Sequence, residues 1–487
     1  MKTRLSLYII TVALIAASCD EFLDESPETF QTPTAFFQTE AQIDEAVAGI
    51  YNTNRGLNNG AHWRFGENRS DNTSFQFNPG DRGGQGNEDV DLFLMLSANG
   101  NLSSYWNTSY SGISRANFVL ENIDDVEFIN EDNRDIRRGE VLFLRSWFYF
   151  NLVQLFGDVP FVTSAGDSPD EILSDEFLER IPIAQVYANI LGDAQTAIDL
   201  LPAPGATETG RANRGAALML KAKMHMVLQE FAEARPLLEQ IQGLGYSLQA
   251  TYPSVFDPAN KNNSESIFEI QYSFALGQGS NFVSNFVPFN SGNDILGENG
   301  PPNSRAGQNQ PTQDLINLYT PEDARFLHNI SFYDDGMTIE PWMSKYNFGF
   351  EAQGNNTQDV NFPMFRYADA LLLLAEVYNE VGGGDPVALL EQIRARSLTD
   401  ASLSPEELAD LEQTIADERR RELAFENHRW FDLLRTGKAV EVMTAHGVEQ
   451  RALRATDPPQ AYTNIRTLLG IPLGQVEEFG FTQNEGW

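Results

Sequence analysis

The sequence predicts a mainly α-helical protein, built as a tetratricopeptide-like scaffold of helix pairs with long irregular loop insertions and minor β-structure. Several segments place apolar residues three or four positions apart, which is the period of a helix with one buried face. In residues 216–241, the positions of Ala222, His225, Phe231 and Ala234 are similar to a tetratricopeptide repeat, with small residues where two helices touch. One such pair cannot bury its own face, so several must stack, and the helices of this chain suffice for about four pairs.

The predicted helices divide the chain into three scaffold segments and two insertions. Thr39 is a candidate N-cap for the first helix, in which Ile43, Val47 and Ile50 share one face. The other predicted helices lie at residues 105–123, 137–156, 182–201, 216–241, 363–381, 386–396 and from 405 onward. The best strand candidate is 266–270. We therefore expect a single domain over 39–487, with scaffold at 39–56, 105–243 and 363–446 and insertions at 57–104 and 244–362.

The last helical stretch combines an apolar face with many charges. The apolar positions that predict one continuous helix are Leu408, Leu411, Ile415, Leu423, Trp430 and Leu434. Three charged pairs are spaced three apart, namely Glu418 with Arg421, Glu426 with Arg429, and Asp432 with Arg435. We expect these charges to form a solvated face with weak ion pairs rather than a catalytic group.

The overall charge limits the possible partners. The chain has 487 residues, 33 of them basic and 69 acidic, for a net charge of −36. This balance argues against nucleic acid, because phosphate binding relies on Lys and Arg. It favours neutral or cationic ligands and suits a saline medium.

The N-terminus is typical of an exported lipoprotein. Lys2 and Arg4 precede an apolar run over residues 5–17 that is too short to span a bilayer, which needs roughly 20 apolar residues. Cys19, the only cysteine, follows this run. We expect 1–18 to be a cleaved signal peptide, Cys19 to be lipidated, and 19–38 to form a tether.

Several motifs together resemble the SusD/RagB family of outer-membrane, nutrient-binding lipoproteins. The similarity covers residues 139–160, 362–376, 415–438, 471–473 and 482–484, in the family's order. The resemblance implies a helical-pair fold and a lipid-anchored position facing the cell exterior. It also implies a SusC-like TonB-dependent β-barrel as partner, which would receive a captured nutrient. Arg69-Ser70-Asp71 recurs in the family, which suggests a structural role, and the acidic residues after Cys19 resemble its surface-delivery signal.

Catalytic and metal motifs give little signal. No Gly-x-Ser-x-Gly turn occurs, and the five histidines are dispersed without zinc spacing. Asn87, Asp89 and Asp91 alternate in a way that could hold calcium, but the glycine and late glutamate of an EF-hand loop are missing. A glycosidase needs two carboxylates flanking the bond, and nothing singles out such a pair. We therefore expect no cofactor and no metal, and the resemblance to the SusD/RagB family implies a binding protein without enzymatic activity.

The insertions carry residue types suited to sugars. A pyranose has apolar C–H faces and hydroxyl edges, so it fits an aromatic ring beside planar polar side chains. The candidates in the first insertion are Trp63, Phe75, Phe77, Asn78 and Arg82. Those in the second are Trp342 and Tyr346, with Lys345 and Asn347 beside them. The alternative is that these aromatics only fix long loops to the scaffold, as Trp106 and Trp147 in helical segments are expected to serve the core.

The sequence thus predicts a surface glycan-binding protein that delivers oligosaccharide to a transporter. Three alternatives remain open. The same architecture could bind oligopeptides, as in the RagB branch, and the acidic charge suits cationic peptides at least as well as glycans. A glycan-degrading enzyme and a pure protein-interaction scaffold are the other two.

Overall fold

The computed structural model describes residues 37–487 apart from 77–83, 167–173, 175–177, 292, 298–306, 349–357 and 455–457. The predicted signal peptide, Cys19 and most of the predicted tether lie outside the described residues, as do Phe77, Asn78 and Arg82. None of the described helices combines the length and apolar character needed to cross a membrane.

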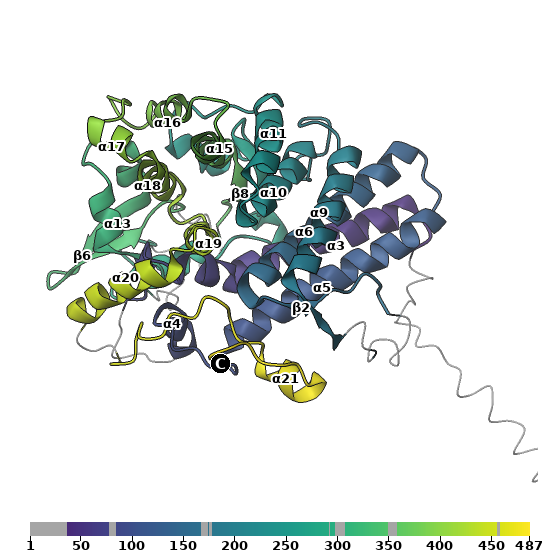
Figure 1. Ribbon diagram of the computed structural model, residues 1–487, viewed down its shortest axis with the longest axis horizontal. Helices are drawn as coiled ribbons and strands as arrows, with labels where there is room; N and C mark the ends of the chain where they lie inside the picture. Colours follow the sequence, from purple (N-terminus) through teal and green to yellow (C-terminus); the bar gives the residue numbers. More distant parts are fainter. Residues whose placement is uncertain are drawn as a thin grey trace, which may run out of the picture.

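A continuous stack of helices forms the scaffold, which confirms the predicted fold class. Its members are α3 (Glu40–Leu57), α5 (Gly100–Asn122), α6 (Glu131–Phe156), α9 (Ile183–Leu200), α10 (Arg214–Val227), α11 (Phe231–Gln242), α15 (Tyr367–Val381), α16 (Pro386–Arg394) and α18 (Leu411–Leu423). Successive members pack against each other from α3 to α11, and α11 then packs against α15. The first helices therefore lie at one end of the molecule and α15 to α18 at the other (Figure 1).

Local sequence signals set the ends and faces of these helices. The Thr39 side chain accepts a hydrogen bond from the Gln42 N–H and caps α3, as predicted. Ile43, Val47 and Ile50 are fully buried, which confirms the apolar face. At the other end of a helix, Gly157 follows α6 with φ 73°, a conformation that glycine adopts without a steric cost.

The remaining elements are short and lie mostly in the insertions and the C-terminal part. The strands are β1 (Thr73–Ser74), β2 (Val159–Pro160), β3 (Arg180–Ile181), β4 (Ser266–Ile270), β5 (Gln310–Pro311), β6 (Ile330–Asp334), β7 (Ile339–Met343) and β8 (Phe362–Arg366). The further α-helices are α4 (Gln85–Asp91), α12 (Phe282–Phe286), α13 (Gln313–Leu318), α14 (Ala324–Asn329), α17 (Pro405–Ala409), α19 (Arg429–Arg435), α20 (Ala439–Leu453) and α21 (Leu473–Phe479). Single turns occur at Asn58–His62, Arg64–Asn68, Ile123–Asp125, Pro253–Val255, Pro258–Asn260 and Phe274–Leu276.

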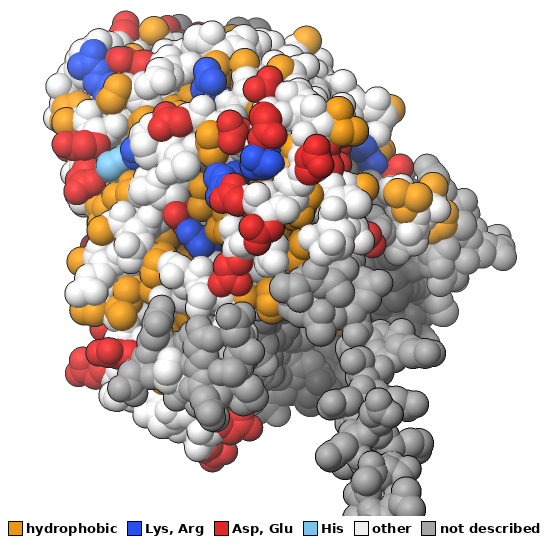
Figure 2. All heavy atoms as spheres, turned by 90° about the vertical axis from the view of Figure 1, so that its right-hand side faces the viewer, with side chains coloured by type: hydrophobic (Ala, Val, Ile, Leu, Met, Phe, Trp, Pro, Cys, Tyr) orange, Lys and Arg blue, Asp and Glu red, His pale blue; other side chains and the backbone are white. Residues whose placement is uncertain are grey.

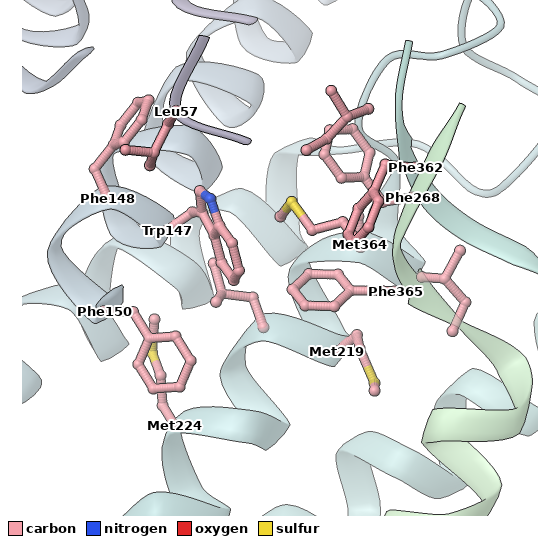
Figure 3. Close-up of a cluster of buried hydrophobic side chains, with 14 of the residues drawn as sticks. Leu57, Trp147, Phe148, Phe150, Met219, Met224, Phe268, Phe362, Met364 and Phe365 are labelled. Atoms are coloured by element: carbon pink, nitrogen blue, oxygen red, sulfur yellow. The ribbon is translucent and has the colours of Figure 1, made fainter. Parts of the chain in front are cut away.

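The core lies where α6 and α10 meet the β4–β8 pair. Trp147 of α6 approaches Phe365 of β8 edge to face, with ring centroids 5.6 Å apart. Met219 from α10 and Met364 from β8 lie in the same cluster (Figure 3). Trp106 and Trp147 are both buried, as predicted for the core.

Strand β8 corrects the expected helix at 363–381. Residues 362–366 are extended and pair antiparallel with β4, whose predicted strand at 266–270 is confirmed. The helix α15 begins only at Tyr367. The pairing partner lies about 100 residues away in the chain, so helical periodicity in the following residues concealed the strand.

The last predicted helix is also interrupted. Helix α18 ends at Leu423 and α19 begins at Arg429, because the segment between them turns through Phe425 (φ 66°) and Asn427 (φ 64°). The N–H groups of Phe425 and Asn427 donate to the buried Glu67 carboxylate at 2.9 and 3.2 Å. A carboxylate from the first insertion therefore fixes a turn where the local pattern predicted a helix.

Candidate ligand-binding site

The tertiary structure brings the two insertions together at one place. Strand β1 from the first insertion pairs antiparallel with β5 from the second. The Gln76 N–H donates to the Gly307 carbonyl at 2.7 Å, and the Phe289 N–H donates to the Gln76 side chain at 3.1 Å. We call this region the junction, defined by residues 63, 73–76, 281–291, 307–312 and the β6–β7 hairpin. Trp63 and Phe75 of the first candidate group and Trp342 of the second lie in it.

The hairpin closes one side of the junction. Trp342 of β7 packs with Val287 and Leu296, and Tyr333 of β6 covers the same cluster. The Gln310 side chain of β5 donates to the Glu340 carboxylate at 2.6 Å. The hairpin is thus fixed to the second insertion by both apolar and polar contacts.

The predicted aromatic residues that the structure describes, Trp63, Phe75, Trp342 and Tyr346, are buried. Trp63 is 3% exposed, and its ring meets Phe286 edge to face with centroids 4.8 Å apart. Phe75 and Trp342 are buried, and the buried Tyr346 donates its hydroxyl to the Phe425 carbonyl at 3.2 Å. This burial favours the alternative that these rings fix the loops to the scaffold. Their ligand-binding role stays a prediction.

The polar neighbours of Trp342 and Tyr346 differ in their surroundings. Lys345 is fully buried, and its ammonium donates to the Tyr252 hydroxyl, the Ala424 carbonyl and the Glu426 carboxylate at 2.6–2.8 Å. Burial lowers the pKa of Lys345 to about 8. This ammonium already has three protein partners and is closed to a ligand, so Lys345 belongs to the internal structure. Asn347 is partly exposed.

Several buried polar atoms at the junction have no hydrogen-bond partner among the residues that the structure describes. They are Trp63 Nε1, Asn281 Oδ1, Asn290 Oδ1, Ser291 Oγ, Gln308 Oε1 and Asn309 Oδ1. A buried polar group that stays unsatisfied costs about 1–3 kcal/mol, so such groups normally bind water or a ligand. The junction therefore contains unpaired, enclosed hydrogen-bonding atoms of the kind that a water molecule or a hydroxyl group satisfies.

The junction also contains two partly exposed aromatic side chains, Phe289 and Tyr333, that sequence reasoning did not select. Phe289 is half-buried next to Gln76, and Tyr333 is partly exposed and donates its hydroxyl to Asp294 at 2.8 Å. Phe332 is 52% exposed but points to the opposite face of the hairpin, because successive strand residues alternate. The β-branched and aromatic residues Ile330, Phe332 and Tyr333 were the available signal for the strand that carries Tyr333.

The possible calcium ligands are used within the protein. Asn87, Asp89 and Asp91 lie on helix α4, not on a loop. The Asp91 carboxylate accepts hydrogen bonds from the Phe75 N–H and the Tyr462 hydroxyl, both at 2.8 Å. Within the described ranges, no group of three or more His, Cys, Asp or Glu side chains is arranged to hold a metal ion.

A buried charge network holds the two insertions to the scaffold and corrects the expected solvated face. Glu418, Glu422 and Glu426 are 0–2% exposed. The predicted pairs Glu418–Arg421 and Asp432–Arg435 form, at 3.1 and 2.8 Å. The Glu426 carboxylate instead pairs with Lys345 and Arg366.

These charged side chains are buried because they form ion pairs with oppositely charged residues from distant parts of the sequence. Arg429 pairs with Asp71 of the first insertion at 2.7 Å, and Arg325 of the second insertion pairs with Glu418 at 2.5 Å. Burial alone would raise the pKa of Glu418, but Arg325, Arg421 and Arg394 lower it to about 2. The contacts of Asp71 and the burial of Arg69 and Ser70 agree with a structural role for Arg69-Ser70-Asp71.

Four histidines are also enclosed. Burial lowers the pKa of His62, His328 and His446 to about 4 and that of His428 to about 3. These imidazoles are therefore neutral near pH 7. His225 is buried in α10 beside Glu230, as expected for a helix-interface residue.

Comparisons with known proteins agree with this architecture. Residues 21–226 match a family model described as starch-binding and associating with the outer membrane, and residues 329–487 match the model of the SusD family. The chain is similar to the SusD-like protein P25 of Formosa agariphila, with 28% identity over 98% of this chain and 97% of that protein. It is also similar to the starch-binding protein SusD of Bacteroides thetaiotaomicron, with 23% identity over the full length of both.

Solved structures share the fold. A laminarin binding SusD-like protein matches with a TM-score of 0.76 and 26% identity, covering 92% of this chain and 100% of that one. A surface glycan-binding protein A from Bacteroides uniformis matches with a TM-score of 0.75 and 23% identity, over 92% of this chain and 99% of that one. The family that the sequence motifs resemble is thereby confirmed.

Proposed function

We propose that this chain, which belongs to the SusD/RagB family, is a cell-surface glycan-binding lipoprotein that captures an oligosaccharide and delivers it to a SusC-like TonB-dependent transporter. The observation that carries the proposal is its similarity to a laminarin binding SusD-like protein over 92% of this chain. The signal segment ending at Cys19 supports lipid anchoring to the outer membrane, facing the cell exterior.

The junction is the proposed ligand site. Its unsatisfied amide and hydroxyl oxygens suit the hydroxyl edges of a sugar, and the rings of Phe289 and Tyr333 suit its C–H faces. The mechanism is capture and transfer without a covalent step. Binding is expected to be modest, because a ligand held very tightly would not pass to the transporter.

Oligopeptide binding is the second candidate function. The net charge of −36 favours it, since cationic peptides would be attracted to an acidic protein. Figure 2 shows acidic side chains spread among basic ones over the described part of one face rather than gathered in one patch. Attraction of this kind would be general and would fall steeply with added salt, whereas glycan binding would not.

The test uses a soluble form of the protein that starts at Asp20. This form is titrated calorimetrically with oligosaccharides and with mixed peptides. The informative variants are Tyr333→Ala, on the junction side of β6, and its neighbour Phe332→Ala, on the opposite side. We expect about tenfold weaker oligosaccharide binding for Tyr333→Ala, which corresponds to about 1.4 kcal/mol, and no change for Phe332→Ala.

Each alternative has its own signature in this experiment. Binding of peptides only would transfer the assignment to the RagB-type function. Release of reducing sugar during incubation with a polysaccharide would identify an enzyme. Binding of no small ligand at all would favour a protein-interaction scaffold, and equal losses in the two variants would remove the junction as the site.

A further inference from the structure

A second groove lies on the scaffold, between α3, the loop 204–213 and strand β4. It consists of two cavities of about 340 and 270 Å³ on either side of residues 209–211. Both cavities are lined by Thr209, Gly210, Arg211, Phe268 and Glu269, so they are adjacent. Gly210 lies between them, so close to Gln271 that an added Cβ would be 2.6 Å from that side chain. We call the two cavities together the scaffold groove. None of its lining residues belongs to the junction.

Neutral hydrogen-bonding side chains dominate its walls. The amides of Asn262 and Gln271 bond each other reciprocally, with both distances 2.9 Å. Asn361 also donates to Gln271 at 2.9 Å, which fixes the pair from below. The Asn262 side-chain amide has one N–H and one oxygen lone pair that the reciprocal bonds with Gln271 do not use. The bonds to Gln271 already fix the position of this amide. Preorganised groups of this kind lose little entropy when they bind.

Aromatic rings lie beside these amides. Tyr246, half-buried in the larger cavity, donates its hydroxyl to Asn213 at 2.8 Å. Tyr51, half-buried in the smaller cavity, accepts a hydrogen bond from the Ala212 N–H at 2.9 Å. Each cavity thus combines a ring with amide or hydroxyl groups, the combination that fits a sugar.

The charges in the groove are largely compensated, unlike those of the whole chain. The Glu208 carboxylate pairs with Arg211 at 2.8 Å, and Arg211 also pairs with Glu140 at 2.9 Å. The Glu269 carboxylate is buried and accepts hydrogen bonds from Asn361 and the Asn262 N–H. At the far end, Arg55 donates to Asn52 and to the Gln271 carbonyl. The carboxylates of the described groove residues are thus paired or hydrogen-bonded within the protein, so a neutral ligand rich in hydroxyls fits the groove better than a cationic peptide.

We propose that the scaffold groove is a second carbohydrate-binding site, which takes a neutral oligosaccharide segment. This inference rests on the proposed glycan-binding function and adds a site to it. A long glycan that contacts both the junction and the groove gains affinity by avidity, because binding at one site raises the local concentration at the other.

The decisive variant is Asn262→Gly. Asn262 has φ 53°, which glycine adopts without strain, so the substitution removes the amide and leaves the backbone conformation accessible. Gln271 keeps its bonds to Asn361 and to the Glu269 carbonyl. The matched control is Gln229→Gly, at another left-handed position with φ 59° that lies outside the groove. A second variant, Thr209→Leu, places a bulkier side chain at the exposed residue shared by both cavities.

The measurement is calorimetric stoichiometry with a short oligosaccharide, followed by titration with the parent polysaccharide. We expect two short ligands per wild-type and Gln229→Gly chain, and one per Asn262→Gly or Thr209→Leu chain. Apparent polysaccharide affinity should fall about tenfold in the groove variants. One ligand per wild-type chain, with groove variants unchanged, would overturn this inference and leave the proposed function intact. Absence of glycan binding in the wild type would overturn both.

Discussion

Arg366 is the centre of the buried charge network, and its removal should be strongly destabilising. The side chain is 1% exposed and donates to the Glu265, Glu422 and Glu426 carboxylates at 2.6–2.9 Å. It also donates to the Glu422 carbonyl. Arg366→Met fills similar space but leaves three buried carboxylates without this cation.

The remaining cations offset only part of the loss. Arg396 still pairs with Glu265 and Glu422, and Lys345 still pairs with Glu426. Removing one partner of a buried ion pair costs about 3–5 kcal/mol, because the other partner stays desolvated. Since Arg366 serves three carboxylates, we expect the upper end, about 5 kcal/mol. The control is Arg138→Met, whose pair with Asp124 is solvent-exposed and should be worth under about 1 kcal/mol.

Urea unfolding at pH 8 and pH 5 measures both effects. The shift in the midpoint, multiplied by the slope of the same transition, gives the change in unfolding free energy. For Arg366→Met the deficit should be smaller at pH 5, because one stranded carboxylate can take up a proton and lose its charge. If Arg366→Met costs no more than Arg138→Met, the network is not stabilised by charge pairing and the reasoning fails.

Three further predictions concern pH, packing and salt. The four buried histidines have folded-state pKa values below 6.5, so the unfolded chain binds more protons and stability should fall as the pH drops from 6.5 to about 4. The free energy of unfolding should fall by up to about 3 kcal/mol per histidine. Melting temperatures that stay constant over this pH range would contradict the prediction. Gly66→Ala should lower the free energy of unfolding in urea by about 1–3 kcal/mol, because its Cβ would lie 2.7 Å from Asn427. The control Gly56→Ala has open space in α3 and should be neutral or stabilising. Equal costs for the two variants would exclude the close contact as the cause. Raising NaCl from about 10 mM to about 0.5 M should raise the melting temperature by screening the net charge of −36, and full stability without salt would count against adaptation to a saline medium.

The sequence by itself determined the features that depend on neighbouring residues. Apolar spacing predicted the stacked helices, and Thr39 marked the start of α3 because a cap acts within one turn. The composition of 266–270 predicted β4. These signals are local, so they can be read along one segment without knowledge of its partners.

Only the tertiary structure decided which charged side chains are buried and how the two insertions pack. Glu426 looked like part of a solvated helix face, but Lys345 and Arg366 enclose it from other parts of the chain. Trp63 and Trp342 could serve a ligand or fix the loops from sequence alone, and the structure packs them against Phe286 and Val287. The physical reason is that burial of a charge or a ring depends on partners far away in the sequence, and β1–β5 pairing joins residues more than 200 positions apart.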